Sequence, residues 1–355
     1  MSEPFQTLKM FGFLVLKLTG GFHIARYLTR HGLRILCYHG FSLTDEHEFR
    51  PHLFMDLRTF RKRMAFLKEA EFSVLSLAEA VRGLQEGALP PDPVVLTFDD
   101  GFHSIFSKAL PVLQEHGFPG TVYVTTYYSV KGNPVFRLAV QHMFWKTSRR
   151  MLDLSGLGLP VDGPLPIKGR ADRRKVTWRI IHHAEGEMSE HDRCALAAEL
   201  GSRLGVPYEP LWAQKGLSIM SADEIREAAA SGFDVQLHTH RHRMPQNPAL
   251  ARREIRENRL ILEPLVGRPL QHLCYPTGVW HEELFPILAD EGIASATTCD
   301  PGLNYRGTHR FALRRFLDGM HISGIEFEAE VCGVAELMRR FRSVLRRALL
   351  VLRRS

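Results

Sequence analysis

Short apolar runs and longer amphipathic stretches alternate along most of the chain. Period-2 or continuous apolar patterning predicts strands at 34–38, 93–98, 120–125, 233–237, 270–275, 293–298 and 311–316. Helical spacing predicts helices at 57–70, 77–86, 104–116, 221–231, 248–265 and 281–291. Regular alternation of strands with helices is typical of an α/β fold built on a parallel sheet.

The alternation is interrupted by residues 131–216, a segment far longer than one strand–helix–strand passage needs. Helical spacing recurs inside it near 136–152, 172–185 and 191–204, with a Gly/Pro-rich stretch after the first. We therefore expect an inserted helical unit. Two roles are open for it, because it can shape a substrate site or serve as a packing appendage away from the chemistry.

Both ends of the chain predict helices outside this pattern. Residues 1–33 form an apolar, weakly basic leader, and residues 335–355 form a basic amphipathic helix. From residue 337 onward this last helix has no acid and seven arginines: Arg339, Arg340, Arg342, Arg346, Arg347, Arg353 and Arg354. Basic amphipathic helices of this kind bind to anionic membrane surfaces. A solvated terminal helix or a nucleic-acid-binding segment shares the pattern, but no aromatic-interleaved basic groove accompanies it.

The first chemical signal follows the strand predicted at 93–98. The run ends in Asp99 and Asp100 and then a glycine. Two adjacent carboxylates repel each other unless a cation or a proton lies between them. Asp-Asp-Gly also suits an ordinary turn, so this motif alone does not decide between a turn and a site.

A second signal follows the strand predicted at 233–237, where three histidines occur within five residues. His238 and His242 are four residues apart, so one helical turn would place both imidazoles on one side, while His240 would point elsewhere. Together with Asp100, the two histidines would make three metal ligands. A fourth position then stays open for water, as hydrolytic zinc sites require.

These residues carry a resemblance to a known family. Residues 97–101 (Thr-Phe-Asp-Asp-Gly) and the His-Thr-x-x-His of His238 and His242 resemble the first two motifs of the polysaccharide deacetylases, carbohydrate esterases with the nodulation-factor deacetylase homology domain. The resemblance implies that Asp99 is the catalytic base and that Asp100, His238 and His242 bind a divalent metal, commonly Zn²⁺. It also implies a distorted (β/α) barrel of about seven parallel strands over residues 34–330. Residues 36–39 (Leu-Cys-Tyr-His) resemble the first strand of one branch.

The chain departs from the family at its third motif, residues 274–278 (Cys-Tyr-Pro-Thr-Gly). The family has an arginine that orients the base where this chain has Cys274, and an aromatic residue where it has Thr277. We expect the Thr277 N–H to stabilise the oxyanion and Arg315, at the end of the last predicted strand, to replace the lost arginine. For the general acid we expect His321, which follows that strand, with His309 as the alternative.

We therefore expect metal-dependent hydrolysis of an N-acetyl group from an amino sugar. A nucleotide- or lipid-linked intermediate of bacterial surface polysaccharide biosynthesis is the expected substrate, because a cytoplasmic enzyme does not meet the finished polymer. Deformylation or hydrolysis of a small amide at the same site is an alternative. A non-catalytic, membrane-associated relative is another.

Composition limits the setting of this chemistry. The five cysteines lie far apart, which argues against a disulfide framework or a thiolate zinc site. The chain has no apolar stretch of membrane-spanning length, and its start lacks the pattern of a signal peptide. The prediction is a cytoplasmic protein, peripheral on the inner membrane, that binds an N-acetylated sugar rather than nucleic acid; the sequence predicts no oligomeric state.

Overall fold

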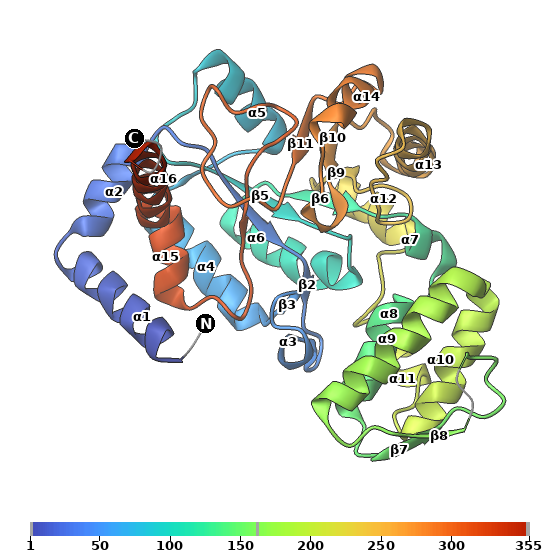
Figure 1. Cartoon of the computed structure of the whole chain (residues 1–355). Coiled ribbons are helices and arrows are strands. Elements are labelled where there is room, and N and C mark those ends of the chain that lie inside the picture. The colour runs from blue at the N-terminus through green and yellow to red at the C-terminus, as the bar shows by residue number, and fades with distance from the viewer. Residues whose placement is uncertain (1–2, 161–162, 353–355) are drawn as a thin grey trace.

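A parallel barrel lies between two groups of helices in the computed structural model, which describes residues 3–160 and 163–352 (Figure 1). The main sheet has all its strands parallel and runs in the order β11 (Ser295–Thr297), β10 (His272–Cys274), β9 (Asp234–Leu237), β6 (Thr121–Val124), β5 (Pro93–Phe98), β1 (Arg34–Tyr38) and β12 (Phe316–Leu317), with β4 (Ser73–Val74) beside the start of β5. Every residue of β1, β5 and β6 is buried, because helices cover their outer faces. The expected distorted barrel of about seven parallel strands is confirmed.

The segment predicted as a strand at 311–316 closes the ring, although most of it is not a regular strand. The Leu313 N–H donates to the carbonyl of Ala296 in β11, whereas Phe316 pairs with Leu36 of β1. A segment that changes neighbours within three residues cannot build an extended ladder with either one. The strand assignment is therefore wrong for residues 311–315 and right for Phe316.

Helices connect the strands on the outside of the barrel. They are α4 (Leu57–Glu69), α5 (Leu77–Glu86), α6 (Leu110–His116), α12 (Ala222–Ala230), α13 (Pro248–Val266) and α14 (Phe285–Asp290), with the short α7 (Tyr127–Lys131) after β6. Local sequence sets several starts, as when Ser76 and Ser221 each form a capping box with a glutamate three residues on. The predicted helix at 104–116 begins as the π-helical η1 (Ile105–Ala109), and the one at 281–291 begins as the 3₁₀ turn η3 (Glu282–Leu284).

Short elements also surround the ends of the strands. After β1 the chain forms β2 (Gly40–Phe41) and α3 (Glu46–Phe49), and then β3 (Phe54–Met55), which pairs with β2. The 3₁₀ turn η2 (Pro276–Gly278) follows β10.

The inserted segment forms a helical unit with its own apolar cluster. It contains α8 (Phe136–Lys146), the antiparallel pair β7 (Met151–Asp153) and β8 (Pro164–Pro166), then α9 (Arg170–Glu187), α10 (Glu190–Leu204) and α11 (Glu209–Gln214). Its ends meet where Pro134 bridges to Ser218. Buried side chains such as Met143, Ile180 and Leu200 fill its centre.

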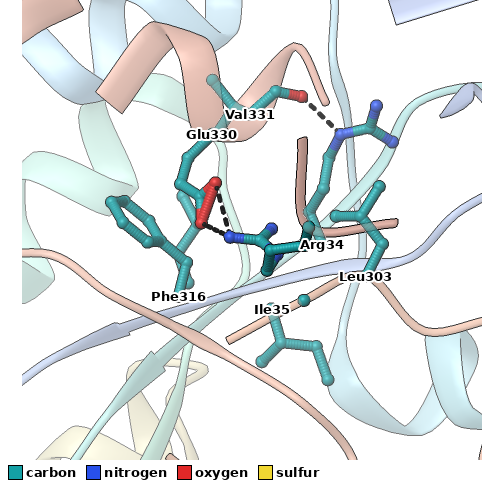
Figure 2. A pocket seen from close by; sticks show the side chains of 9 residues that line it. Arg34, Ile35, Leu303, Phe316, Glu330 and Val331 are labelled. Atoms are coloured by element: carbon teal, nitrogen blue, oxygen red, sulfur yellow. Dashed lines mark hydrogen bonds and ion pairs between the residues drawn. The ribbon is translucent and has the colours of Figure 1, made fainter. Parts of the chain in front are cut away.

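The terminal helices pack together on the other side of the barrel (Figure 1). They are α1 (Glu3–Leu18), α2 (Gly21–Thr29), α15 (Gly324–Val331) and α16 (Val334–Leu352), with α1 against α15 and α16 against α2. Figure 2 shows how they join the barrel at the start of β1. The buried Arg34 donates from Nε to the Val331 carbonyl at 2.5 Å, and Arg339 forms an ion pair of 2.6 Å with Glu330.

Helices are present at both ends of the described chain, as the sequence predicts, and Arg353 and Arg354 lie outside the described residues. Among the described helices none is both long and apolar enough to cross a membrane alone. Residues 6–18 and α2 would qualify as a pair by length and composition, but a bend of 83° separates them.

Candidate active site

The residues singled out from the sequence gather where the parallel strands end. Asp99 and Asp100 follow β5, His238 and His242 follow β9, and Thr277 follows β10. Parallel strands of a barrel deliver their carboxyl ends to one rim, and this rim is where barrel enzymes place their chemistry.

Three donor atoms converge at the expected metal site. Asp100 Oδ1 lies 3.3 Å from His238 Nε2 and 3.1 Å from His242 Nε2. The ligand atoms of all three residues lie within 4.8 Å of one another. Asp100 Oδ1 and His238 Nε2 are both buried without a hydrogen-bond partner. Burial opposes ionisation of Asp100, but the imidazoles of His242 and His238 outweigh it and hold the pKa of Asp100 well below its usual range.

The second nitrogen of His238 shows what this site requires. His238 Nδ1 lies 2.9 Å from the carbonyl oxygen of Cys274, which can only accept, so Nδ1 carries the proton. In the neutral imidazole Nε2 then directs a lone pair towards the Asp100 carboxylate. Two acceptors 3.3 Å apart in a buried place repel each other unless a cation or a proton lies between them. Burial lowers the pKa of His238, but the carboxylates of Asp100 and Asp99 outweigh it and raise that pKa. The donor set and the fixed tautomer therefore fit a divalent metal.

The two histidines converge through a strained loop rather than through the helical turn expected from their spacing. Thr239 and His242 both have left-handed backbone, with φ of 63° and 53°, so residues 238–242 cannot form a helix. Asp100 (φ 68°) and Thr277 (φ 58°) share this conformation. Four of the seven such non-glycine residues in the described chain lie at this rim, as expected for a functional site. His240 points away and bonds Thr126 Oγ1 at 2.8 Å.

Arg315 holds Asp99 through two parallel hydrogen bonds. Its two terminal nitrogens each lie 2.7 Å from a different oxygen of the Asp99 carboxylate, and both side chains are buried. Burial alone would raise the pKa of Asp99, but the Arg315 guanidinium overrides it and lowers that pKa far below its ordinary value. The same guanidinium lies 3.1 Å from Cys274 Sγ. Arg315, directly before β12, thus takes the role that the resemblance gives to the missing arginine after β10.

Sequence reasoning missed His39 as a site residue. Its Nε2 lies 3.9 Å from Asp99 Oδ2, and it follows β1 as the other site residues follow their strands. Burial lowers the pKa of His39, although the carboxylates of Asp99 and Asp100 act against that shift. The same strand-end rule, applied to the Tyr-His at positions 38 and 39, would have identified it.

Among the described residues, neither of the two histidines expected as the general acid has a hydrogen bond or ion pair to Asp99 or Asp100. The His321 ring lies tilted against that of His52, with 3.8 Å between ring centres, and its Nδ1 faces the Pro51 carbonyl. His309 stacks on Phe285 at 4.3 Å. Burial and His52 lower the pKa of His321, whereas the Pro51 carbonyl and Glu326 act in the opposite direction. Neither Asp99 nor Asp100 is among the groups that shift this pKa.

A cavity of about 630 Å³ opens beside the three donor atoms, lined by Asp100, His242 and Thr277. The inserted unit forms part of its wall through Arg137 of α8, Glu185 of α9 and Arg193 of α10. Of the two roles left open for this unit, the structure therefore places it at the cavity rather than away from it. Arg241 and Arg243, in the loop that carries His242, complete a lining of four guanidinium groups.

Comparison with known proteins points in the same direction. The model of the polysaccharide deacetylase family matches residues 86–154 and 200–296, which contain Asp99, Asp100, His238 and His242 but neither His39 nor Arg315. The chain is 37% identical over 78 residues to the poly-β-1,6-N-acetyl-D-glucosamine N-deacetylase of Escherichia coli K12, covering 21% of this chain and only 12% of that protein.

Two solved structures share the fold. The deacetylase PplD of Streptococcus pyogenes superposes with a TM-score of 0.57 at 16% identity, covering 85% of this chain and 99% of that one. IcaB of Ammonifex degensii superposes with a TM-score of 0.53 at 18% identity, covering 85% and 96%. With the site geometry and the family match, these findings show that the chain belongs to the polysaccharide deacetylase family.

Proposed function

We propose that this protein is a metal-dependent N-deacetylase of amino sugars. The observation that carries the proposal is the pair of buried, unpartnered acceptor atoms, Asp100 Oδ1 and His238 Nε2, which lie 3.3 Å apart beside the cavity that Asp100 lines. Membership of the polysaccharide deacetylase family supports the same reaction. In that reaction the amide C–N bond breaks, a C–O bond to water forms, and acetate and a free amine leave.

Asp100, His238 and His242 would hold the metal. A divalent cation, for which Zn²⁺ suits the nitrogen and oxygen ligands, supplies Lewis-acid chemistry that polarises the acyl carbonyl and acidifies water. Asp99, which directly precedes the metal ligand Asp100 in the chain, accepts the proton of the attacking water. Arg315 keeps Asp99 ionised and fixes the plane of its carboxylate. Thr277 lines the cavity, and its N–H would donate to the oxyanion.

His39 is the best placed donor of a proton to the leaving amine. It lies on the rim beside Asp99, whereas His321 contacts the 51–52 segment. A His39→Gln variant should keep its metal and lose turnover, while His321→Gln should retain both. The opposite result would return the role to His321.

The cavity presents guanidinium groups to a substrate. Its lining carries Arg137, Arg193, Arg241 and Arg243, of which Arg137 pairs with Glu185, Arg193 with Glu190, and Arg241 and Arg243 with Glu254. Arg243 is the most accessible of the four, with 64% of its side chain exposed. Guanidinium groups bind phosphate oxygens in pairs, which supports an N-acetyl sugar carried on a nucleotide or lipid phosphate.

Acetate release with a matched set of substrates tests this function. The purified full chain would be loaded with Zn²⁺ and offered N-acetylglucosamine oligomers, a nucleotide-linked N-acetyl sugar and a lipid-linked one, with the N-formyl sugars alongside. Acetate from any of them, abolished in Asp99→Asn, supports the proposal. A chain that binds no metal and releases no acyl group from any substrate would be the non-catalytic relative instead.

A further inference from the structure

The terminal helices leave an apolar surface facing outward. Of the 21 large hydrophobic side chains that are exposed among the described residues, 14 lie on α1, α2 and α16. The most exposed of them are Leu8, Phe11, Leu18, Ile24, Tyr27, Leu28, Phe341 and Val344, each at 60% or more. We call this set the terminal apolar face. A soluble monomer rarely leaves so many large apolar side chains together in water.

The opposite sides of the same helices are fixed to the barrel. Phe13 of α1 and Phe22 of α2 are each 5% exposed and belong to the main apolar core with β1 and β5. On α1, residues 8, 11, 15 and 18 recur at helical spacing, so the exposed side chains share one side of the helix. Each helix thus has one side committed to protein, and a bilayer could contact only the other.

Charge identifies the partner. Residues 1–31 have four basic residues and one acid, and residues 337–355 have seven arginines and no acid. Lys9, Lys17 and Arg26 pair with Glu326, Glu328 and Asp92, so the unpaired positive charge lies mainly on α16. Arg342 and Arg346 are exposed on α16, and no carboxylate pairs with either within the described chain. Two copies of this face brought together would set positive charge against positive charge. An anionic surface is attracted instead, by about 1 kcal/mol for each nearby basic residue.

We propose that α1, α2 and α16 together form an interfacial docking surface for an anionic lipid bilayer. The bend of 83° after Leu18 and the buried faces of α1 and α2 favour helices that lie in the headgroup region over a membrane span. Tyr27, with Arg30 stacked 4.6 Å from its ring centre, has the amphipathic character of an interfacial anchor. This surface extends the membrane association expected for the last helix alone to both ends of the chain, and it does not depend on the proposed reaction.

The docking surface lies away from the chemistry. Arg34, at the start of β1, donates to Thr29 at the end of α2, while His39 follows the other end of β1, about 17 Å further along a strand of five residues. Occupation of the surface by lipid should therefore leave hydrolysis of a soluble substrate unchanged.

Vesicle flotation of the full chain tests the proposal. We expect binding to vesicles of phosphatidylcholine with 30% phosphatidylglycerol at low salt, and at least about ten-fold weaker binding to pure phosphatidylcholine. The double variant Phe11→Asp/Ile24→Asp should lose at least about ten-fold in binding, because it places charge on two exposed apolar positions of the face, one on α1 and one on α2. Leu260→Asp is the matched control, since Leu260 is 76% exposed on α13, outside the face, and should bind as the parent does.

Three outcomes would overturn the inference. One is a parent chain that floats with neither vesicle, and another is equal loss of binding in Leu260→Asp. The third is a dimer in sedimentation equilibrium that Phe11→Asp/Ile24→Asp converts to monomer without any vesicle binding, which would assign the face to a second copy. Unchanged circular dichroism of each variant shows that the comparison is made between folded proteins.

Discussion

The inserted unit and the terminal helices are both amphipathic helical additions to one barrel, and they differ in what meets their apolar sides. The inserted unit buries Met143, Ile180 and Leu200 in a cluster of its own. The terminal helices bury one side and expose Phe11, Ile24 and their neighbours on the other. Amphipathic spacing indicates that a helix has an apolar side. It does not indicate whether other parts of the same chain cover that side.

The two additions also stand differently to the chemistry. The inserted unit contributes Arg137 and Arg193 to the cavity that holds Asp100 and His242. The terminal helices contact the barrel at Arg34, at the far end of β1. Substitutions on one side of the barrel should therefore change catalysis, and substitutions on the other side should change localisation.

The largest expected effect is a loss of catalysis without a loss of membrane binding, from substitution of the metal ligands. Asp100→Ala, His238→Ala and His242→Ala should each lose bound metal and more than about a hundred-fold in turnover, because three ligands leave no spare one. Vesicle binding should stay at the parent level in all three. Elemental analysis and flotation check both parts, and full metal content in all three variants would refute the ligand set.

Arg315→Ala should come next, with the metal retained. Breaking a buried ion pair leaves the Asp99 charge unpaired, which should cost about 3–5 kcal/mol in the free energy of unfolding. Without the guanidinium, burial raises the pKa of Asp99, so the acid limb of the kcat/KM profile should move to higher pH. Arg314→Ala is the control, since Arg314 is the exposed neighbour. An acid limb at the same pH in Arg315→Ala would show that Arg315 does not control the pKa of the catalytic base.

A smaller effect should arise in the inserted unit. Arg137→Ala should raise KM about ten-fold for a phosphate-carrying substrate and leave KM for an uncharged oligomer unchanged. Arg203 lies in the same unit outside the cavity and pairs with Glu199, so Arg203→Ala should match the parent. Equal KM values for both substrates in Arg137→Ala would show that the unit does not select charge.

The smallest effect on catalysis is expected from the terminal side. A chain ending after Arg340 keeps the ion pairs of Arg339 and Arg340 with Glu330 and Glu336 but loses five arginines. It should hydrolyse a soluble substrate within about two-fold of the parent and bind anionic vesicles more weakly. A loss of turnover as large as the loss of vesicle binding would show that the terminal helices and the active site are not independent.

The sequence was sufficient where a signal is local. Continuous apolar runs predicted β1 and β5 to the residue, because helices bury the outer face of each strand and the barrel interior buries the inner face. Each run is followed directly by a residue of the site. Arg315 was found through an absence, since Cys274 stands where an arginine is expected and a buried Asp99 needs a cation.

The rest depends on distant contacts. Nothing local tells that residues 311–317 change partners between β11 and β1, or that Arg137 and Asp100 share a cavity. The i, i+4 spacing of His238 and His242 wrongly predicted a helical turn. Left-handed backbone at Thr239 brings the two imidazoles together instead. The exposure of Phe11 was equally hidden, since it depends on which side of α1 the barrel covers.

The segment that closes the ring also carries Arg315, and this has a consequence for a chain still on the ribosome. Asp99, Asp100, His238 and His242 all emerge well before Arg315 does. Until that last strand docks, the carboxyl group of Asp99 lacks the cation that keeps it charged when buried. A nascent or truncated chain can thus assemble most of the rim and remain inactive, so the finished ring is itself the condition for activity.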